Sequence, residues 1–390
     1  MKRSTRLIRA RVIGGVGALA VTALALAGCS SGGSSSGSGD STDAASGDLT
    51  PVSLQLQWFS QAQFAGYYAA LDQGFYEKEG LDVTILEGAA DIVPIDVLTG
   101  GDADFAISWV PKVLGSIEQG AAVTDIAQIF ERSGTTQISM KDQNITSVAD
   151  LKGKTVGSWG YGNEWELFAG MAKDKVNLSD ISLVSQAFDM NGFLAGDIQA
   201  AQAMTYNEYA QVLESVNPAT GELFTPDELN VIDWNTEGTA MLQDAIWADS
   251  DRLADDADYA DTAVKFIKAS IEGWAYARDN PEEAAKIVTA AGSQLGESHQ
   301  LWMTNEVNKL IWPSTSGVGT INQDQWDQTV SIAMDTPNET GATVITEEPP
   351  ASAFSNEYVE KALAELKDEG VDVMGSDYKP IDVTLKAGGE

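Results

Sequence analysis

Aromatic side chains stand close to the ends of apolar runs that have the length of β-strands. They are Trp58, Trp109, Trp159 and Tyr161. Because α/β sheets place ligands at the ends of their strands, these rings are candidates for one shared binding site. Aromatic faces stack on flat heterocycles, and each such contact contributes roughly 0.5–1.5 kcal/mol beyond its burial. The alternative for any of these rings is packing in the core.

Polar side chains that could fix the orientation of such a ligand occur in the same stretches. The candidates are Gln55, Ser108, Ser133, Gly134, Asn163, Glu164, Tyr206 and Glu208. Backbone N–H groups of the turn 161–164 could donate to ligand oxygens. Three further glutamines (Gln57, Gln61 and Gln63) flank the first loop, and alternation along a strand predicts that only some of these side chains face a ligand.

The charge balance restricts the partners of the chain. The 390 residues carry 58 acidic against 23 basic side chains, a formal net charge of −35. Such a chain repels phosphate backbones and anionic headgroups, so we expect no nucleic-acid partner. The few cations near the candidate loops, Lys112, Arg132 and Lys141, are most simply solvated surface residues. An inorganic anion is therefore the less favoured ligand.

The chain contains one cysteine and one histidine. A disulfide within the chain and a zinc site built from Cys and His are both excluded. We expect no metal, no cofactor and no catalytic residue, and the lone His299 is interpreted as a packing or surface residue. An acid–base enzyme built on Glu164, Glu208 and Asp189 is the alternative. Glu208 could also be a helix-start carboxylate stabilised by the helix dipole.

The first residues have the form of a targeting signal. A basic stretch is followed by an apolar stretch over 12–25, about the length of a signal peptide core and short for a membrane span. It closes with Leu-Ala-Gly-Cys at 26–29, which resembles the lipobox of bacterial lipoproteins. The resemblance implies a signal peptide over 1–28 and lipidation of Cys29. Residues 29–50, rich in Gly and Ser, are predicted to be a flexible tether.

From Pro51 onward, strand-like and helix-like patterns alternate, which favours an α/β architecture. Strands are predicted at 81–86, 103–109 and 136–140 within a first unit spanning 51–141. A second unit spans 142–240. After residue 240 the pattern is mainly helical, with helices predicted over 261–278, 281–291, 297–310 and 322–334.

Four segments, in order, carry a resemblance to a known family. Residues 54–85 contain a strand that ends near Trp58, then Gly-Tyr-Tyr-x-Ala, then Gly-Phe-Tyr-x-x-x-Gly-Leu-x-Val. They are followed by GGDADFAIS (100–108), VADLKGKTVG (148–157) and NPEEAA (280–285). Together they resemble the bacterial substrate-binding proteins that serve ABC importers of thiamine pyrimidine precursors. Relatives in that family serve sulfonates, nitrate and riboflavin.

The resemblance implies a two-lobed periplasmic-binding-protein fold of type II. Each lobe is then a mixed sheet flanked by helices, the ligand cleft lies between the lobes, and residues 241–390 return to the first lobe. The implied protein is a monomer that delivers a small molecule to ABC permease subunits. A lipid would hold it on the outer face of the cell membrane.

The resemblance also bears on the ligand. Trp58, Trp159 and Tyr161 match ligand-loop positions of the family, and the motif at 61–68 adds Phe64 and Tyr67 to the candidates. Pyrimidine-binding relatives commonly have His where this chain has Phe64. The motif is more similar to the members associated with riboflavin uptake.

Two other functions share the same pattern. Fungal relatives synthesise the pyrimidine and use a Cys-rich motif that is absent here. An extracytoplasmic sensor would look identical from the chain, and the genes beside its own would tell it from a transporter component.

Overall fold

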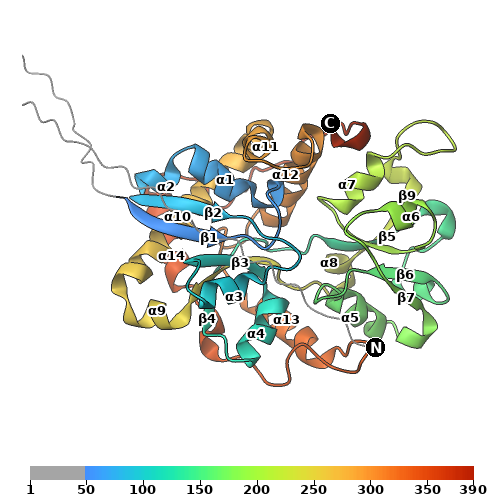
Figure 1. The fold of residues 1–390 in the computed structure, drawn as a ribbon, viewed down its shortest axis with the longest axis horizontal. Helices are drawn as coiled ribbons and strands as arrows, with labels where there is room; N and C mark the ends of the chain where they lie inside the picture. The colour runs from blue at the N-terminus through green and yellow to red at the C-terminus, as the bar shows by residue number, and fades with distance from the viewer. Residues whose placement is uncertain (1–48) are drawn as a thin grey trace, which may run out of the picture. The chain divides into compact units, whose positions relative to one another are not determined.

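The computed structural model describes residues 49–390, so the signal peptide and Cys29 lie outside the described residues. A five-stranded sheet has the order β2-β1-β3-β10-β4 (Figure 1). Its strands are β1 (Thr50–Gln55), β2 (Leu81–Leu86), β3 (Phe105–Trp109), β4 (Val123–Gln128) and β10 (Asp244–Asp249). Strand β1 is parallel to β2 and β3, whereas β10 is antiparallel to β3 and β4. The carboxyl ends of β1, β2 and β3 therefore meet at one edge.

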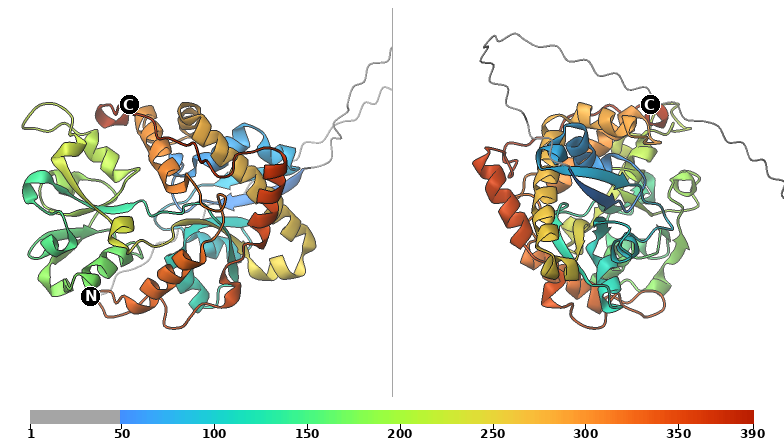
Figure 2. Two further views of the ribbon diagram at one scale, coloured as in Figure 1. Left: turned by 180° about the vertical axis from the view of Figure 1, so that it is seen from behind. Right: turned by 60° about the vertical axis from the view of Figure 1, so that its left-hand side comes forward.

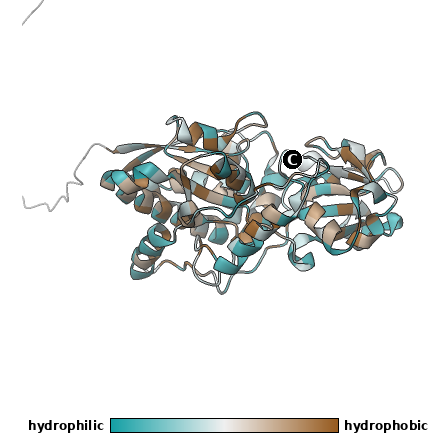
Figure 3. Cartoon of the chain, turned by 90° about the horizontal axis from the view of Figure 1, so that it is seen from below, coloured by the Kyte–Doolittle hydropathy of each residue, from teal (hydrophilic) through white to brown (hydrophobic). Residues whose placement is uncertain are grey.

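Helices cover both faces of this sheet (Figure 2). One face packs on α1 (Ala65–Asp72), α10 (Ala257–Asp279), α11 (Pro281–Ala290), α12 (Glu297–Ile311) and α14 (Glu357–Asp368). The other face packs on α3 (Pro94–Thr99), α4 (Val110–Glu118) and α13 (Gln323–Asp335). In Figure 3, hydrophobic and hydrophilic residues alternate along these helices, as expected when one side of a helix is buried.

Helices α1 and α10 approach closely because glycines face one another. A Cβ on Gly273 would lie 2.0 Å from the carbonyl oxygen of Gly66, and one on Gly66 would lie 2.1 Å from the Trp274 ring. Either substitution would force the helices apart, so both positions require glycine. This contact fixes the start of α1, and with it the loop that follows β1.

A second set of strands forms the other lobe. Strands β8 (Ala201–Met204), β5 (Thr135–Met140) and β9 (Leu229–Asp233) are antiparallel, and β6 (Thr155–Ser158) is parallel to β7 (Ser182–Ser185). The Gly157 N–H donates to the Ala200 carbonyl at 2.8 Å, which connects β6 to β8. The main helices here are α5 (Trp165–Lys173), α6 (Asn191–Leu194) and α7 (Glu208–Leu213).

The expected mixed sheets flanked by helices are confirmed, with one correction. The strand predicted at 136–140 belongs to the second set of strands, where β5 pairs with β8 and β9, and not to the first sheet. Its apolar character gave no information on its pairing. The chain crosses between the sheets over 129–134 and again over 234–243. Within residues 49–390, no helix is both long enough and apolar enough to span a membrane.

Candidate functional site

A cavity of about 790 Å³ lies where the strand ends of the two sheets face each other. Its walls come from the segments after β1, β2 and β3 on one side, and after β6, β7 and β8 on the other. Ligand sites of α/β proteins prefer the carboxyl ends of strands and the space between lobes. The position of this cavity follows both preferences.

Many of the residues predicted from the sequence line this cavity. They are Trp58, Ser108, Trp109, Trp159, Tyr161, Asn163, Tyr206 and Glu208. Their place on the wall is a finding, whereas their contact with a ligand stays a prediction.

Aromatic rings from the two lobes meet at the cavity through Phe188, which follows β7. The Phe188 ring centroid lies 4.8 Å from that of Trp58 and 6.3 Å from that of Trp159, and the Trp159 pair is nearly parallel at 23°. Phe188 is 45% exposed, so water reaches this cluster. Rings at this spacing pack directly against one another.

Tyr161 belongs to a tight turn with left-handed backbone. Its φ is 54°, and its neighbours Gly160 and Gly162 have φ of 68° and 85°. A non-glycine residue with positive φ is strained, and such strain gathers at binding sites. The side chain of Tyr161 is 91% exposed at the mouth of the cavity.

Asp244, at the start of β10, organises one wall of the cavity. Its Oδ1 accepts hydrogen bonds from Gln57 Nε2 at 2.6 Å and Trp109 Nε1 at 2.7 Å, and its Oδ2 accepts from Gln63 Nε2 at 2.9 Å. Burial raises the pKa of Asp244 to about 7, and these three donors oppose the shift. One buried carboxyl group thus fixes three residues of the wall.

Glu208 supplies a titratable group on the side of the second lobe. Its carboxyl oxygens accept from the Met204 N–H at 3.0 Å and from Asn207 Nδ2 at 2.9 Å. Burial raises the pKa of Glu208 to about 7. Near neutral pH it can therefore accept a hydrogen bond from a ligand or donate one.

Three predicted residues lie in or beneath the core of the first lobe instead of on the wall. Phe64 and Tyr67 are 0% and 1% exposed, and the Tyr67 ring packs edge-on against Trp274. The buried face of α1 is turned toward α10, which the motif alone did not indicate. Gln55 is also buried, and its amide donates to the carbonyls of Leu56 and Glu87. None of the three lines the cavity, and their contact with a ligand stays a prediction.

The other three residues outside the wall have structural partners. The Ser133 hydroxyl donates to Glu166 Oε2 at 3.0 Å, and a Cβ on Gly134 would lie 2.9 Å from the Tyr206 ring. Glu164 accepts the Gly162 N–H at 2.9 Å and closes the turn that carries Tyr161. All three support neighbours of the cavity without lining it.

Several lining residues were not among the sequence-based candidates. They are Lys112, Ser116, Phe188, Met204, Asn207 and the segment 89–95. The three glutamines that flank the first loop, Gln57, Gln61 and Gln63, all line the cavity. The segment 89–95 follows β2 and Phe188 follows β7, so the strand-end rule applied to every strand would have found them. Lys112, which we expected on the surface, lies on the wall.

The lone histidine is buried and paired. His299 Nδ1 lies 2.8 Å from Glu214 Oε1, and Nε2 lies 3.1 Å from Asn207 Oδ1. The Asn207 amide in turn donates to Glu208, so α12 contacts the second lobe behind the cavity wall. Within residues 49–390, no group of three or more His, Cys, Asp or Glu side chains could hold a metal ion.

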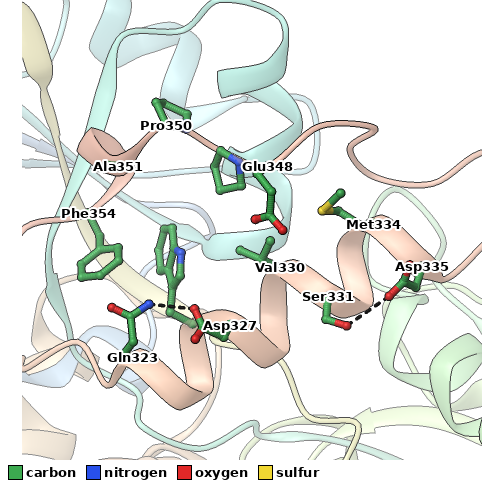
Figure 4. A pocket seen from close by; sticks show the side chains of 12 residues that line it. Gln323, Asp327, Val330, Ser331, Met334, Asp335, Glu348, Pro350, Ala351 and Phe354 are labelled. Carbon is green, nitrogen blue, oxygen red and sulfur yellow. Dashed lines mark hydrogen bonds between the residues drawn. The ribbon is translucent and has the colours of Figure 1, made fainter.

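A second pocket of about 610 Å³ lies along α13 (Figure 4). Its walls come only from residues 323–354, and they include Trp326, Phe354 and Glu348. Side chains of α13 bond to one another along this wall, as Gln323 does to Asp327 and Ser331 to Asp335. None of the sequence-based candidates lies here, and the pocket does not join the two sheets.

A mixed five-stranded sheet and a second set of antiparallel and parallel strands, with a cavity where their strand ends face each other, define the fold class of the periplasmic binding proteins. The SsuA aliphatic sulphonate binding protein of Escherichia coli shares this fold, with a TM-score of 0.55 over 87% of this chain and 95% of its own, at 14% identity. The family model described as NMT1/THI5 like matches residues 61–284. The chain belongs to this family.

Three relatives were compared by sequence. A Haemophilus influenzae protein named for thiamine biosynthesis is 27% identical over 46% of this chain and 58% of its own length. The formylaminopyrimidine-binding protein of Halalkalibacterium halodurans is 23% identical over 63% of this chain and 73% of its own. The riboflavin-binding protein RibY of Chloroflexus aurantiacus is 26% identical over 62% of this chain and 66% of its own length.

Enzymes match a shorter stretch of the chain. A 4-amino-5-hydroxymethyl-2-methylpyrimidine phosphate synthase of Legionella pneumophila is 28% identical over 27% of this chain and 34% of its own length. The formylaminopyrimidine-binding and riboflavin-binding relatives match over 60% of this chain.

Proposed function

We propose that this protein is the extracytoplasmic binding component of an ABC importer and captures a flat heteroaromatic vitamin or vitamin precursor. The observation that carries the proposal is the cavity between the sheets, with aromatic walls from both lobes. The two binding-protein relatives support a thiamine pyrimidine precursor or riboflavin as the ligand. The proposed partners are the permease subunits, and the binding component acts as a monomer.

The proposed mechanism is closure of two lobes around the ligand. The lobes are those of the five-stranded sheet and of the second set of strands, joined by the crossovers at 129–134 and 234–243. A ligand that contacts Trp58 on one lobe and Trp159 on the other binds more tightly when the lobes are close. This differential affinity shifts the population toward the closed form.

A small anion such as a sulfonate or nitrate is the second candidate ligand, because Lys112 lies on the cavity wall. A thermal-shift titration of the purified chain with riboflavin, formylaminopyrimidine, taurine and nitrate separates the two. Saturation with a ligand at 100 times its Kd stabilises the native state by about 2.7 kcal/mol. We expect a rise in Tm with riboflavin or the pyrimidine. If Tm rises only with taurine or nitrate, the ligand is a small anion and the proposal of a heteroaromatic ligand is wrong.

A catalytic role is the remaining alternative, because synthases share part of the sequence. The binding role is favoured because the walls are rich in aromatic residues and the longer matches are to binding proteins. If the protein converts any of the four probes into a different compound during incubation, it is an enzyme.

We further propose that Cys29 is lipidated and holds the protein on the outer face of the membrane. The support is the basic and apolar signal pattern that ends in Leu-Ala-Gly-Cys. Cys29→Ser is expected to move the protein from the detergent phase to the aqueous phase in a Triton X-114 partition of expressing cells. The unchanged chain is the control. Equal partition of both chains would leave the segment as an ordinary secretory signal.

A further inference from the structure

Lys112 is the cation among the residues that line the cavity between the lobes. It lies in the first turn of α4, and its Nζ is 4.7 Å from the centre of the Trp109 ring. Its stem extends across to the second lobe, since a Cβ on Gly162 would lie 3.4 Å from Lys112 Cγ. The ammonium therefore stands at the boundary of the lobes.

Lys112 is half-buried, and its ammonium has neither a hydrogen-bond partner nor a carboxylate oxygen within 4.0 Å among residues 49–390. Lys268 shows the usual arrangement in this acidic chain, with Glu79, Glu365 and Glu369 at 3.0, 3.2 and 2.6 Å. A partly buried ammonium without a partner is costly. Its placement on a cavity wall means that a ligand atom can supply the missing acceptor.

The groups around Lys112 define what that atom is. Asp244 on β10 and Glu164 before α5 act on the ammonium through space, and both favour its charged form. Burial acts more strongly in the other direction and lowers the pKa of Lys112 to about 8. An anionic or carbonyl oxygen of a ligand would restore a direct contact to the charged form.

We propose that Lys112 binds an oxygen of the ligand, so that the molecule recognised is a flat heterocycle with a carbonyl or anionic oxygen at one end. This inference rests on the proposed function and narrows its ligand class. Glu208, from the second lobe, can bind a ring N–H or amine of the same molecule. A ligand with an acceptor at one end and a donor at the other would link the two lobes.

The test compares Lys112→Met and Lys112→Arg with the unchanged full-length chain. Riboflavin and formylaminopyrimidine are the probes, and the readout is Kd by isothermal titration. The exposed Lys141→Met is the matched control, because it removes the same charge outside the cavity. Lys112→Met is expected to weaken binding at least tenfold at pH 7, and Lys141→Met less than twofold.

A pH series adds a readout that a merely structural role of Lys112 would not move. Between pH 7 and 9 the protonated fraction of the Lys112 amine falls roughly tenfold, so the affinity of the unchanged chain is expected to fall by about that factor relative to Lys112→Arg. Asp244, Glu164 and Glu208 are present in both chains, so the ratio of the two profiles isolates Lys112.

The outcomes separate the inference from the function on which it rests. Weakened binding by Lys112→Met together with the diverging pH profiles supports the inference. Binding of either probe that is unchanged in Lys112→Met overturns the inference and leaves the proposed function intact. If neither probe binds the unchanged chain, the proposed function fails and the inference fails with it.

Discussion

Raising the pH from 5 to 8 is expected to destabilise the folded protein, and Glu166→Gln is expected to remove a large part of that loss. Glu166 lies in α5, 5% exposed. Its Oε1 accepts the Met241 N–H at 2.7 Å, and its Oε2 accepts from the Ser133 hydroxyl at 3.0 Å. Burial raises the pKa of Glu166 to about 8, because a charge at this position has too few partners.

The direction follows from proton binding in the two states. Below pH 4.5 the carboxyl group of Glu166 is protonated whether the chain is folded or unfolded. As the pH rises from there to about 8, the unfolded chain releases the proton and the folded chain keeps it. Unfolding is therefore favoured progressively over this window, and the loss is complete above it. The complete loss is about 5 kcal/mol, because each pKa unit between 4.5 and about 8 contributes about 1.4 kcal/mol.

Glutamine mimics the protonated form of Glu166 over the whole range. Its amide oxygen can accept the Met241 N–H, and its NH2 can donate to the Ser133 oxygen. In urea unfolding, the fall in the free energy of unfolding between pH 5 and pH 8 is expected to be clearly smaller in Glu166→Gln than in the unchanged chain, because Glu166 no longer titrates. Glu282→Gln is the matched control, because Glu282 is exposed. Its free energy of unfolding should fall between pH 5 and pH 8 as much as that of the unchanged chain. If the free energy of unfolding of Glu166→Gln falls between pH 5 and pH 8 as much as that of the unchanged chain, the pH dependence belongs to other groups.

Asp244 and Glu208 contribute to stability in the same direction, because burial raises the pKa of each to about 7. Both lie at the cavity, and Glu166 bonds to Ser133 in the crossover between the sheets. Carboxyl groups with raised pKa values thus gather where the two lobes meet. Groups with such shifts mark functional sites more often than ordinary core positions.

The sequence was sufficient to predict much of the fold and part of the site. The ends of β1, β3 and β6 are marked by aromatic residues, and Trp58, Trp109 and Trp159 all line the cavity. Spacing and composition locate such positions because each belongs to a local strand and its following loop.

The features of the site that the sequence did not predict depend on contacts between segments far apart in the chain. Asp244 meets Gln57, Gln63 and Trp109 only because β10 pairs with β3, a pairing across more than a hundred residues. Lys112 was assigned to the surface because helix periodicity does not show where the second lobe will stand. Tyr67 shares its motif with the wall, yet the packing of α1 on α10 turns it into the core.

Trp159→Ala is expected to weaken binding of the heteroaromatic ligand by on the order of 2–4 kcal/mol, the loss typical of a central aromatic anchor. Trp159 is 4% exposed, and its ring is nearly parallel to that of Phe188. Its Nε1 is buried and has no hydrogen-bond partner among residues 49–390. Both features would be lost with the side chain.

The control for this loss is Trp326→Ala. Trp326 is also 4% exposed, but it lines the pocket along α13 and packs against Phe354. Both substitutions create a cavity and should lower the urea midpoint. Only Trp159→Ala is expected to raise the Kd for riboflavin or formylaminopyrimidine, and Trp159→Phe should recover part of the loss by stacking. Equal affinity of the two alanine variants would assign Trp159 to the core and move the ligand away from the second lobe.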